Sequence, residues 1–173
     1  VLGADWSLRA FDVEGRERWR QPVPGTVWSL NASADGRWVV AAYADGTIRW
    51  HRATDGAEQL AFYPHPDRKR WVLWSPSGFF DASPGAESLI GWHVNRGRDQ
   101  AADFFPAAQF HTKFYRPDVI AALLDTADET RKDLESLAGD AANAANDYSN
   151  QAHGTKVDAP NTSVMSGPTG AAL

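Results

Sequence analysis

The chain contains no cysteine among its 173 residues. This absence excludes a disulfide, a zinc site built on thiolates and a cysteine nucleophile. It does not fix the compartment, because a cysteine-free chain suits both the cytoplasm, which we favour, and the periplasm.

Clustered positive charge is also lacking. The net charge is −5, and the single basic run is Arg68-Lys69-Arg70, which we interpret as a solvated loop. Recognition of nucleic acid requires Lys and Arg gathered on one face, so we expect no nucleic-acid partner. No stretch approaches the ~20 apolar residues that a membrane-spanning helix needs, so we expect no transmembrane segment in this chain.

Tryptophan is missing from the back of the chain and abundant at the front. None of the eight follows Trp92. The composition therefore changes along the sequence, from an aromatic front half to a Trp-free back half.

A ten-residue turn period is the strongest positive signal. Asp35-Gly36, Asp45-Gly46 and Asp55-Gly56 recur at this interval, separated by stretches rich in aromatic and β-branched residues. Asp-Gly favours a tight hairpin because Gly adopts φ > 0 without steric cost. The interval leaves room for strands of about six residues. We predict an antiparallel meander with turns at these pairs and at Glu14-Gly15, and no helix between Thr26 and Phe62.

A second, longer period is superimposed on the first. The stretch Ala4–Arg9 matches Ala44–Arg49 at an offset of 40, and Glu17 matches Glu58 at an offset of 41. A repeat of about 40 to 45 residues carrying four strands is typical of a β-propeller blade. One blade cannot bury both of its faces, so blades stack with bulky aromatics between them. The tryptophan excess of the front half is explained in this way.

This repeat resembles the blades of WD-repeat proteins, with Phe11-Asp12 at the place of the Trp-Asp dipeptide. The stretch Leu8–Trp19 also resembles a blade of the pyrroloquinoline-quinone type, in which a Gly is followed four residues on by Trp. Trp71–Ile120 is similar to the segment that closes the WD-repeat region in bacterial proteins carrying a caspase-like peptidase domain. The resemblance implies a propeller. It implies no peptidase activity here, because the chain has no caspase-like His or Cys dyad.

The predicted fold is mainly β, with two to three antiparallel four-stranded blades forming a partial propeller, followed by a helical segment and an extended tail. Val1–Trp19 supplies the last strands of one blade, Thr26–Phe62 a whole blade, and Arg70–Val94 most of a third. A closed propeller needs about 4 to 8 blades. We therefore expect a fragment of a longer product or a companion chain, the alternative being an open sheet sandwich. Matching residues such as Leu8 and Ile48 should occupy the same strand and face the same layer.

The predicted organisation places the partial propeller at residues 1–97, an aromatic linker and amphipathic helix at 98–139, and a low-complexity tail at 140–173. Residues 101–105 and 110–115 are interpreted as short helical or irregular pieces. Pro117 suits the first position of a helix. From Asp118, apolar residues recur at steps of three and four up to Leu134 and Leu137, which gives one apolar stripe.

No catalytic, cofactor or metal site is found in the sequence. The five His lack metal-ligand spacing, and the aspartates of the tail lack the alternation of a calcium loop. The serines lack a Gly-x-Ser-x-Gly elbow. We therefore expect no enzyme and no cofactor.

The favoured function is a non-enzymatic protein-interaction or scaffold module, because loops on a rigid scaffold are where binding residues concentrate. Its partner would be a protein, or further blades on another chain. The alternatives are the regulatory propeller portion of a bacterial caspase-like peptidase without its catalytic domain, and a structural subunit of a larger assembly. The candidate contact residues come from one predicted rim and from the helical stripe: Trp6, Tyr43, Asp45, Asp67, Arg68, Lys69, Arg70, Leu134 and Leu137.

Overall fold

The computed structural model describes residues 1–96, 101–124, 147 and 164–166. The fold is mainly β, with antiparallel sheets and short helices. The chain divides into two units, Val1–Pro64 and His65–Leu173. Among the described residues, no helix is both long enough and apolar enough to cross a membrane.

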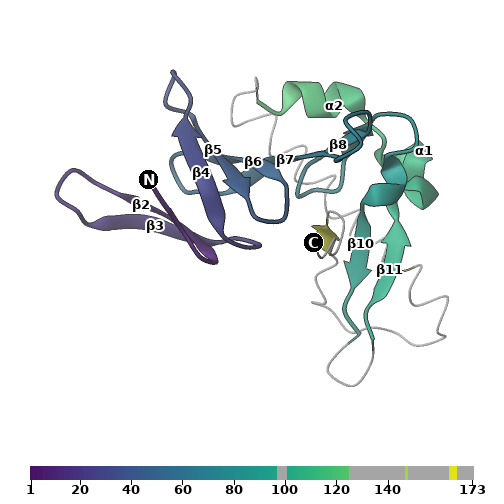
Figure 1. The fold of residues 1–173 in the computed structure, drawn as a ribbon, viewed down its shortest axis with the longest axis horizontal. Helices are drawn as coiled ribbons and strands as arrows, with labels where there is room; N and C mark the ends of the chain where they lie inside the picture. Colours follow the sequence, from purple (N-terminus) through teal and green to yellow (C-terminus); the bar gives the residue numbers. More distant parts are fainter. Residues whose placement is uncertain (97–100, 125–146, 148–163, 167–173) are drawn as a thin grey trace. The chain divides into compact units, whose positions relative to one another are not determined.

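The first unit contains two antiparallel meanders (Figure 1). The first meander consists of β1 (Leu2–Ala4), β2 (Ser7–Phe11) and β3 (Glu17–Pro22). The second consists of β4 (Val27–Ala32), β5 (Trp38–Tyr43), β6 (Ile48–Arg52) and β7 (Glu58–Pro64). In each meander, strands that are consecutive in the sequence pair with one another. The predicted four-stranded meander over Thr26–Phe62 is therefore present and contains no helix.

All four predicted glycine turns are confirmed. Gly15, Gly36, Gly46 and Gly56 have φ between 72° and 83°. The loops of the second meander are longer than the two-residue hairpins that Asp-Gly pairs favour. In each of them a backbone bond closes a first turn before the glycine, as from Gly36 N–H to the Ser33 carbonyl at 2.9 Å. The two-residue turn occurs instead at Asp5-Trp6, where Ala4 pairs with Ser7.

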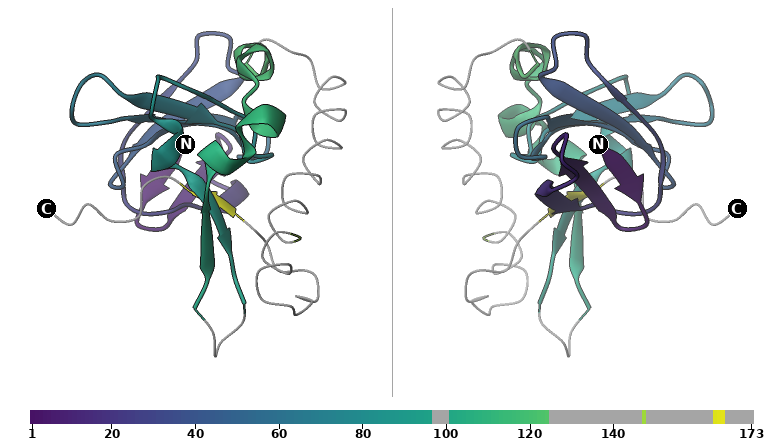
Figure 2. Two further views of the ribbon diagram at one scale, coloured as in Figure 1. Left: turned by 90° about the vertical axis from the view of Figure 1, so that its right-hand side faces the viewer. Right: turned by 90° about the vertical axis from the view of Figure 1, so that its left-hand side faces the viewer.

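The core of the first unit lies between the two meanders. Leu8 of β2 is buried together with Val39, Ala41 and Tyr43 of β5. Trp19 of β3 packs on this cluster, and its indole N–H donates to the Ala53 carbonyl at 2.9 Å. The right-hand view of Figure 2 shows the dark purple strands of the first meander. One face of the first meander is therefore covered by the second.

Leu8 and Ile48 occupy matching strands, as the 40-residue offset predicts. Leu8 is fully buried and Ile48 is half-buried. Because side chains alternate along a strand, both point to the side opposite the matching arginines Arg9 and Arg49. The period therefore relates equivalent positions in the structure as well as in the sequence.

The second unit begins with β8 (Trp71–Trp74) and β9 (Phe80–Ala82), an antiparallel pair, followed by the short helix η1 (Glu87–Leu89). A second sheet has β10 (Gly91–Val94) between β11 (Asp103–Pro106) and β12 (Val164–Ser166). The left-hand view of Figure 2 shows β10 and β11 side by side. The helices η2 (Ala107–Phe110), α1 (His111–Phe114) and α2 (Pro117–Ala122) follow β11. Buried aromatics fill this unit, with Trp92 and Phe114 in contact at a ring separation of 5.5 Å.

Two expectations for this unit need correction. The meander expected over Arg70–Val94 is interrupted, because β10 leaves the β8–β9 pair and bonds to β11 and β12. Residues 103–106 form strand β11, where a helical or irregular piece was expected. The pairing of β10 with the following strand β11 and with the distant β12 explains both differences, since local sequence does not specify which strand β10 pairs with.

The helical prediction is confirmed at its start. Pro117 is the first residue of α2, where its missing N–H costs no hydrogen bond. The continuation of the apolar stripe to Leu134 and Leu137, and most of the 140–173 tail, lie outside the described residues.

Candidate interaction surface

An aspartate shapes each main turn of the second meander. One carboxylate oxygen of Asp35, Asp45 and Asp55 accepts the backbone N–H two residues further on, at 3.1, 2.9 and 3.0 Å. This local bond fixes the turn, and the following glycine supplies the positive φ. The Asp-Gly pairs that recur every ten residues therefore stabilise the turns of the meander.

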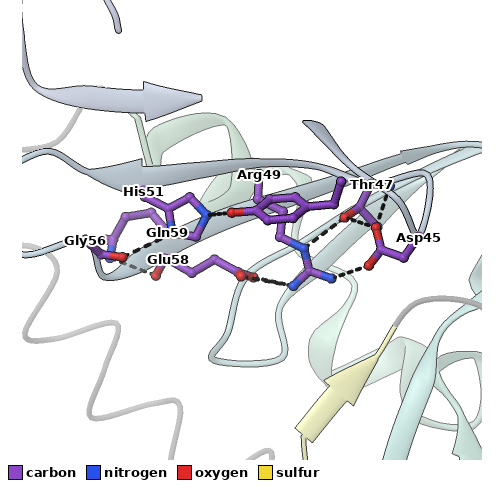
Figure 3. Close-up of polar contacts among 8 residues, drawn as sticks. Asp45, Thr47, Arg49, His51, Gly56, Glu58 and Gln59 are labelled. Atoms are coloured by element: carbon purple, nitrogen blue, oxygen red, sulfur yellow. Dashed lines mark hydrogen bonds and ion pairs between the residues drawn. The ribbon is translucent and has the colours of Figure 1, made fainter. Parts of the chain in front are cut away.

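Arg49 is the centre of a polar network on one face of the second meander (Figure 3). Its guanidinium donates to Glu58 at 2.9 Å, to Asp45 at 3.0 Å and to the Thr47 hydroxyl at 2.9 Å. The Arg49 side chain is only 12% exposed. Burial opposes its charge, but the two carboxylates more than offset this effect and raise the pKa of Arg49. The network is therefore a satisfied, half-buried ion cluster.

The same face carries a neutral buried pair. His51 Nδ1 lies 3.1 Å from the Gly56 carbonyl oxygen, and His51 Nε2 lies 2.8 Å from the Tyr43 hydroxyl. A carbonyl can only accept, so Nδ1 carries the proton and Nε2 accepts the Tyr43 O–H. Burial lowers the pKa of His51 and raises that of Tyr43. Both groups are therefore held in their uncharged forms.

The first meander repeats the network in a looser form. Arg9 matches Arg49, and its Nε donates to the Ser7 hydroxyl at 3.3 Å, as Arg49 donates to Thr47. Glu17 matches Glu58, but it lies 3.9 Å from Arg9. The side chains of Arg9 and Glu17 are 32% and 41% exposed. The internal repeat thus includes a polar cluster that is closed in one meander and open in the other.

The Arg49–Glu58 pair is closer than the Arg9–Glu17 pair because the face that carries Arg49 is covered and the face that carries Arg9 is not. Ala41, Arg49 and Ala61 are register partners in the second meander, and both alanines are buried. Their counterparts in the first meander are Leu2, Arg9 and Arg20, which are also register partners.

The face of the first meander that carries these three counterparts is exposed. Leu2 is 53% exposed, and Phe11, two residues from Arg9 on the same side of β2, is 40% exposed. We call the surface formed by Leu2, Arg9, Phe11 and Arg20 the open face. The equivalent face of the second meander, which carries Ala41, Arg49 and Ala61, is buried.

The Asp5-Trp6 turn lies beside the open face. Trp6 has φ 60°, the left-handed region that large side chains rarely adopt, and it matches Gly46 in the repeat. Its side chain is 68% exposed. A shallow pocket of about 310 Å³ is lined by Asp5, Trp6, Ser7, Arg9, Arg20 and Pro22. The strained tryptophan therefore forms a wall of a pocket that also contains two arginines.

The residues predicted as contacts from the first unit have different environments. Trp6 is exposed and lines the pocket. Tyr43 is 1% exposed and bonded to His51, so it belongs to the core. Asp45 is bonded to Thr47 and Arg49 within the polar network.

The predicted contacts in the second unit form one turn. The Asp67 carboxylate accepts the backbone N–H groups of Lys69 and Arg70, both at 2.9 Å, and the Arg70 guanidinium at 2.7 Å. Arg68 has φ 59° and is exposed, as is Lys69. Leu134 and Leu137 lie outside the described residues.

Sequence reasoning missed Leu2, Phe11 and Arg20. From the sequence alone, Leu2 and Phe11 would be predicted to lie in the hydrophobic core, because both are large apolar residues in strands. The 41-residue offset that aligns Glu17 with Glu58 also aligns Arg20 with Ala61, whereas the match of Leu2 with Ala41 follows only from the strand register. Arg20 thus stands where the second meander has the buried Ala61, and this difference indicates that the open face is not covered in the same way.

Within the described part of the chain, no group of three or more His, Cys, Asp or Glu residues is arranged to hold a metal ion. The side chains of the open face offer an apolar contact area beside paired guanidinium groups. A search against protein-family models finds no match for this chain.

Proposed function

We propose that this chain is a non-enzymatic protein-interaction or scaffold module built from WD-repeat-like propeller blades. In this proposal, β4–β7 is one complete blade and β1–β3 is most of another. The two meanders share strand order, register partners and a Ser/Thr–Arg–Glu cluster, and they stack face to face. These are the properties of a repeat architecture in which each sheet is stabilised by its neighbours.

The observation that carries the proposal is the open face of β1–β3. Its counterpart in the second meander is buried, whereas Leu2 and Phe11 are exposed. Exposed apolar side chains clustered on a sheet face favour association, because burial removes their surface from water. The module would therefore join a larger assembly by covering this face with another sheet.

Sedimentation velocity over a range of protein concentrations tests this role. The open face carries Arg9 and Arg20 beside Glu17, so a second copy of the chain can serve as the covering sheet. We expect the mean mass to rise above 18.9 kDa with concentration. The Leu2→Glu/Phe11→Ser variant should remain monomeric, because it removes the apolar contact.

Val13→Ser is the matched control, since Val13 is 97% exposed in the β2–β3 turn and lies outside the open face. It should associate like the unmodified chain. A chain that stays monomeric at every concentration, or one whose association is unaffected by the Leu2/Phe11 change, would contradict the proposal.

A further inference from the structure

The two arginines of the open face are short of negative charge. In the second meander one cation, Arg49, has two carboxylates at 2.9 and 3.0 Å, and Ala61 stands beside it in register. In the first meander, Arg9 and Arg20 are register partners, so two like charges face each other across neighbouring strands. Like charges at such positions are destabilising unless an anion lies between or beside them.

Two carboxylates, Glu17 and Asp5, lie near these cations and satisfy them only in part. Asp5 lines the same pocket and matches Asp45 in the repeat, but in the described part of the chain it makes no ion pair with Arg9 or Arg20. Glu17 lies 3.9 Å from Arg9, at the limit of an ion pair, compared with 2.9 Å for Glu58 and Arg49. Arg20 is exposed and makes no ion pair within the described ranges. Guanidinium groups bind carboxylates through paired N–H donors, so the pocket retains donors suited to one more carboxylate.

Trp6 adds an apolar wall to the same pocket. Its position in the repeat is occupied by Gly46 in the second meander, and a left-handed conformation strains a large residue. Strain of this kind persists where the side chain has a use. Trp6 and Pro22 line the same pocket as Arg9 and Arg20.

We propose that this pocket binds an acidic side chain of the protein segment that covers the open face, with the carboxylate on Arg9 and Arg20 and a neighbouring apolar side chain against Trp6. The proposal rests on the protein-interaction role and names the chemistry of its partner: a glutamate or aspartate flanked by an aliphatic residue. Because the pocket is shallow and open to solvent, the interaction is weak for a single short peptide and sensitive to salt.

The test is a titration of ¹⁵N-labelled full-length chain with two peptides, acetyl-Leu-Glu-Leu-amide and acetyl-Leu-Gln-Leu-amide. The indole N–H signal of Trp6 reports on the pocket, and that of Trp28, 74% exposed but outside this pocket, is the internal control. We expect the Glu peptide to shift the Trp6 signal and to bind about fivefold more tightly than the Gln peptide.

Two arginine variants of β3 identify the cation. Arg20→Gln should abolish the preference for the Glu peptide, whereas Arg18→Gln, at an exposed position two residues away that does not line the pocket, should retain it. Equal binding of both peptides, no shift at Trp6, or equal effects of the two variants would overturn the proposal. If sedimentation still shows association dependent on Leu2 and Phe11, the scaffold role stands and only the acidic site is lost.

Discussion

His51 shows how a single buried residue links the second meander to pH. Its ring is 2% exposed and bridges the Tyr43 hydroxyl and the Gly56 carbonyl. Protonation would put a hydrogen on Nε2, which could then no longer accept the Tyr43 O–H. The bridge therefore exists only with neutral histidine.

Stability should consequently fall in mild acid. Burial lowers the pKa of His51 below its ordinary value of 6.5, so the unfolded chain binds more protons than the folded chain below that pH. The free energy of unfolding then decreases as the pH falls below about 6.5 and is unaffected by this group above it. Urea denaturation across this range should show a shallower pH slope for His51→Gln than for the unmodified chain. Identical slopes would show that His51 is not the titrating group.

The two matching glutamates allow a second comparison at single residues. Glu58→Gln removes the charge beside Arg49, whose side chain is only 12% exposed, and should cost about 1–2 kcal/mol of unfolding free energy. Glu17→Gln removes the matching charge from the exposed Arg9 pair and should cost less than about 0.5 kcal/mol. Chemical denaturation of both variants checks this. The measurement is made at concentrations at which the chain is monomeric, and equal losses would mean that the Arg9–Glu17 pair is as strongly coupled as the Arg49–Glu58 pair.

The turns are the elements in which sequence and structure agree most closely. Asp-Gly pairs specify a turn by two local interactions, a carboxylate accepting a nearby N–H and a glycine with positive φ, so their positions could be read directly. The loop lengths could not, because the same residues fit turns of several lengths. The turns at Asp5-Trp6 and Asp67-Arg68 also need a positive φ, but a large residue, Trp6 or Arg68, takes the place of glycine. Nothing in the sequence alone distinguishes such a turn from an ordinary surface loop.

Replacing the two most exposed tryptophans by glycine should have different effects on stability. Trp6→Gly relieves a positive φ and should leave the unfolding free energy unchanged or raise it by up to about 1 kcal/mol. Trp28→Gly, at the register shift between Val27 and Ser29 of strand β4, should lower it by about 1 kcal/mol, because Trp28 has no positive φ to relieve and glycine loses more conformational entropy on folding. Thermal denaturation of the two variants gives the comparison. A loss for Trp6→Gly as large as that for Trp28→Gly would show that Trp6 stabilises the fold.

At the scale of the whole molecule, the repeat was predictable and the coverage of its faces was not. Alternation along β2 separates Leu8 from Arg9, but it does not reveal which side another sheet covers. The second unit was less accessible for a related reason. The pairing of β10 with β11 and with β12, some 70 residues further on, depends on contacts between segments whose local sequences carry no mark of each other.

The pairing of β12 with β10 gives a prediction about long-range order in the second unit. His93 pairs with Val164 and Trp92 with Met165. Successive N–H groups of a strand point to opposite sides, so only one of the two adjacent residues of β12 donates to β10. Proline removes that donor, and therefore one of Val164→Pro and Met165→Pro should lower amide protection in β10 by roughly tenfold while the other has little effect.

Hydrogen exchange on the two proline variants and on their alanine counterparts measures this difference. The alanine variants retain the N–H and should match the unmodified chain at the amides of Gly91–Val94. The amides of Val39–Tyr43, which belong to the other unit, should be unaffected in all four variants. If neither proline changes the protection of β10, the β10–β12 ladder does not hold in solution. If both lower it equally, the effect is loss of the whole segment rather than of one hydrogen bond.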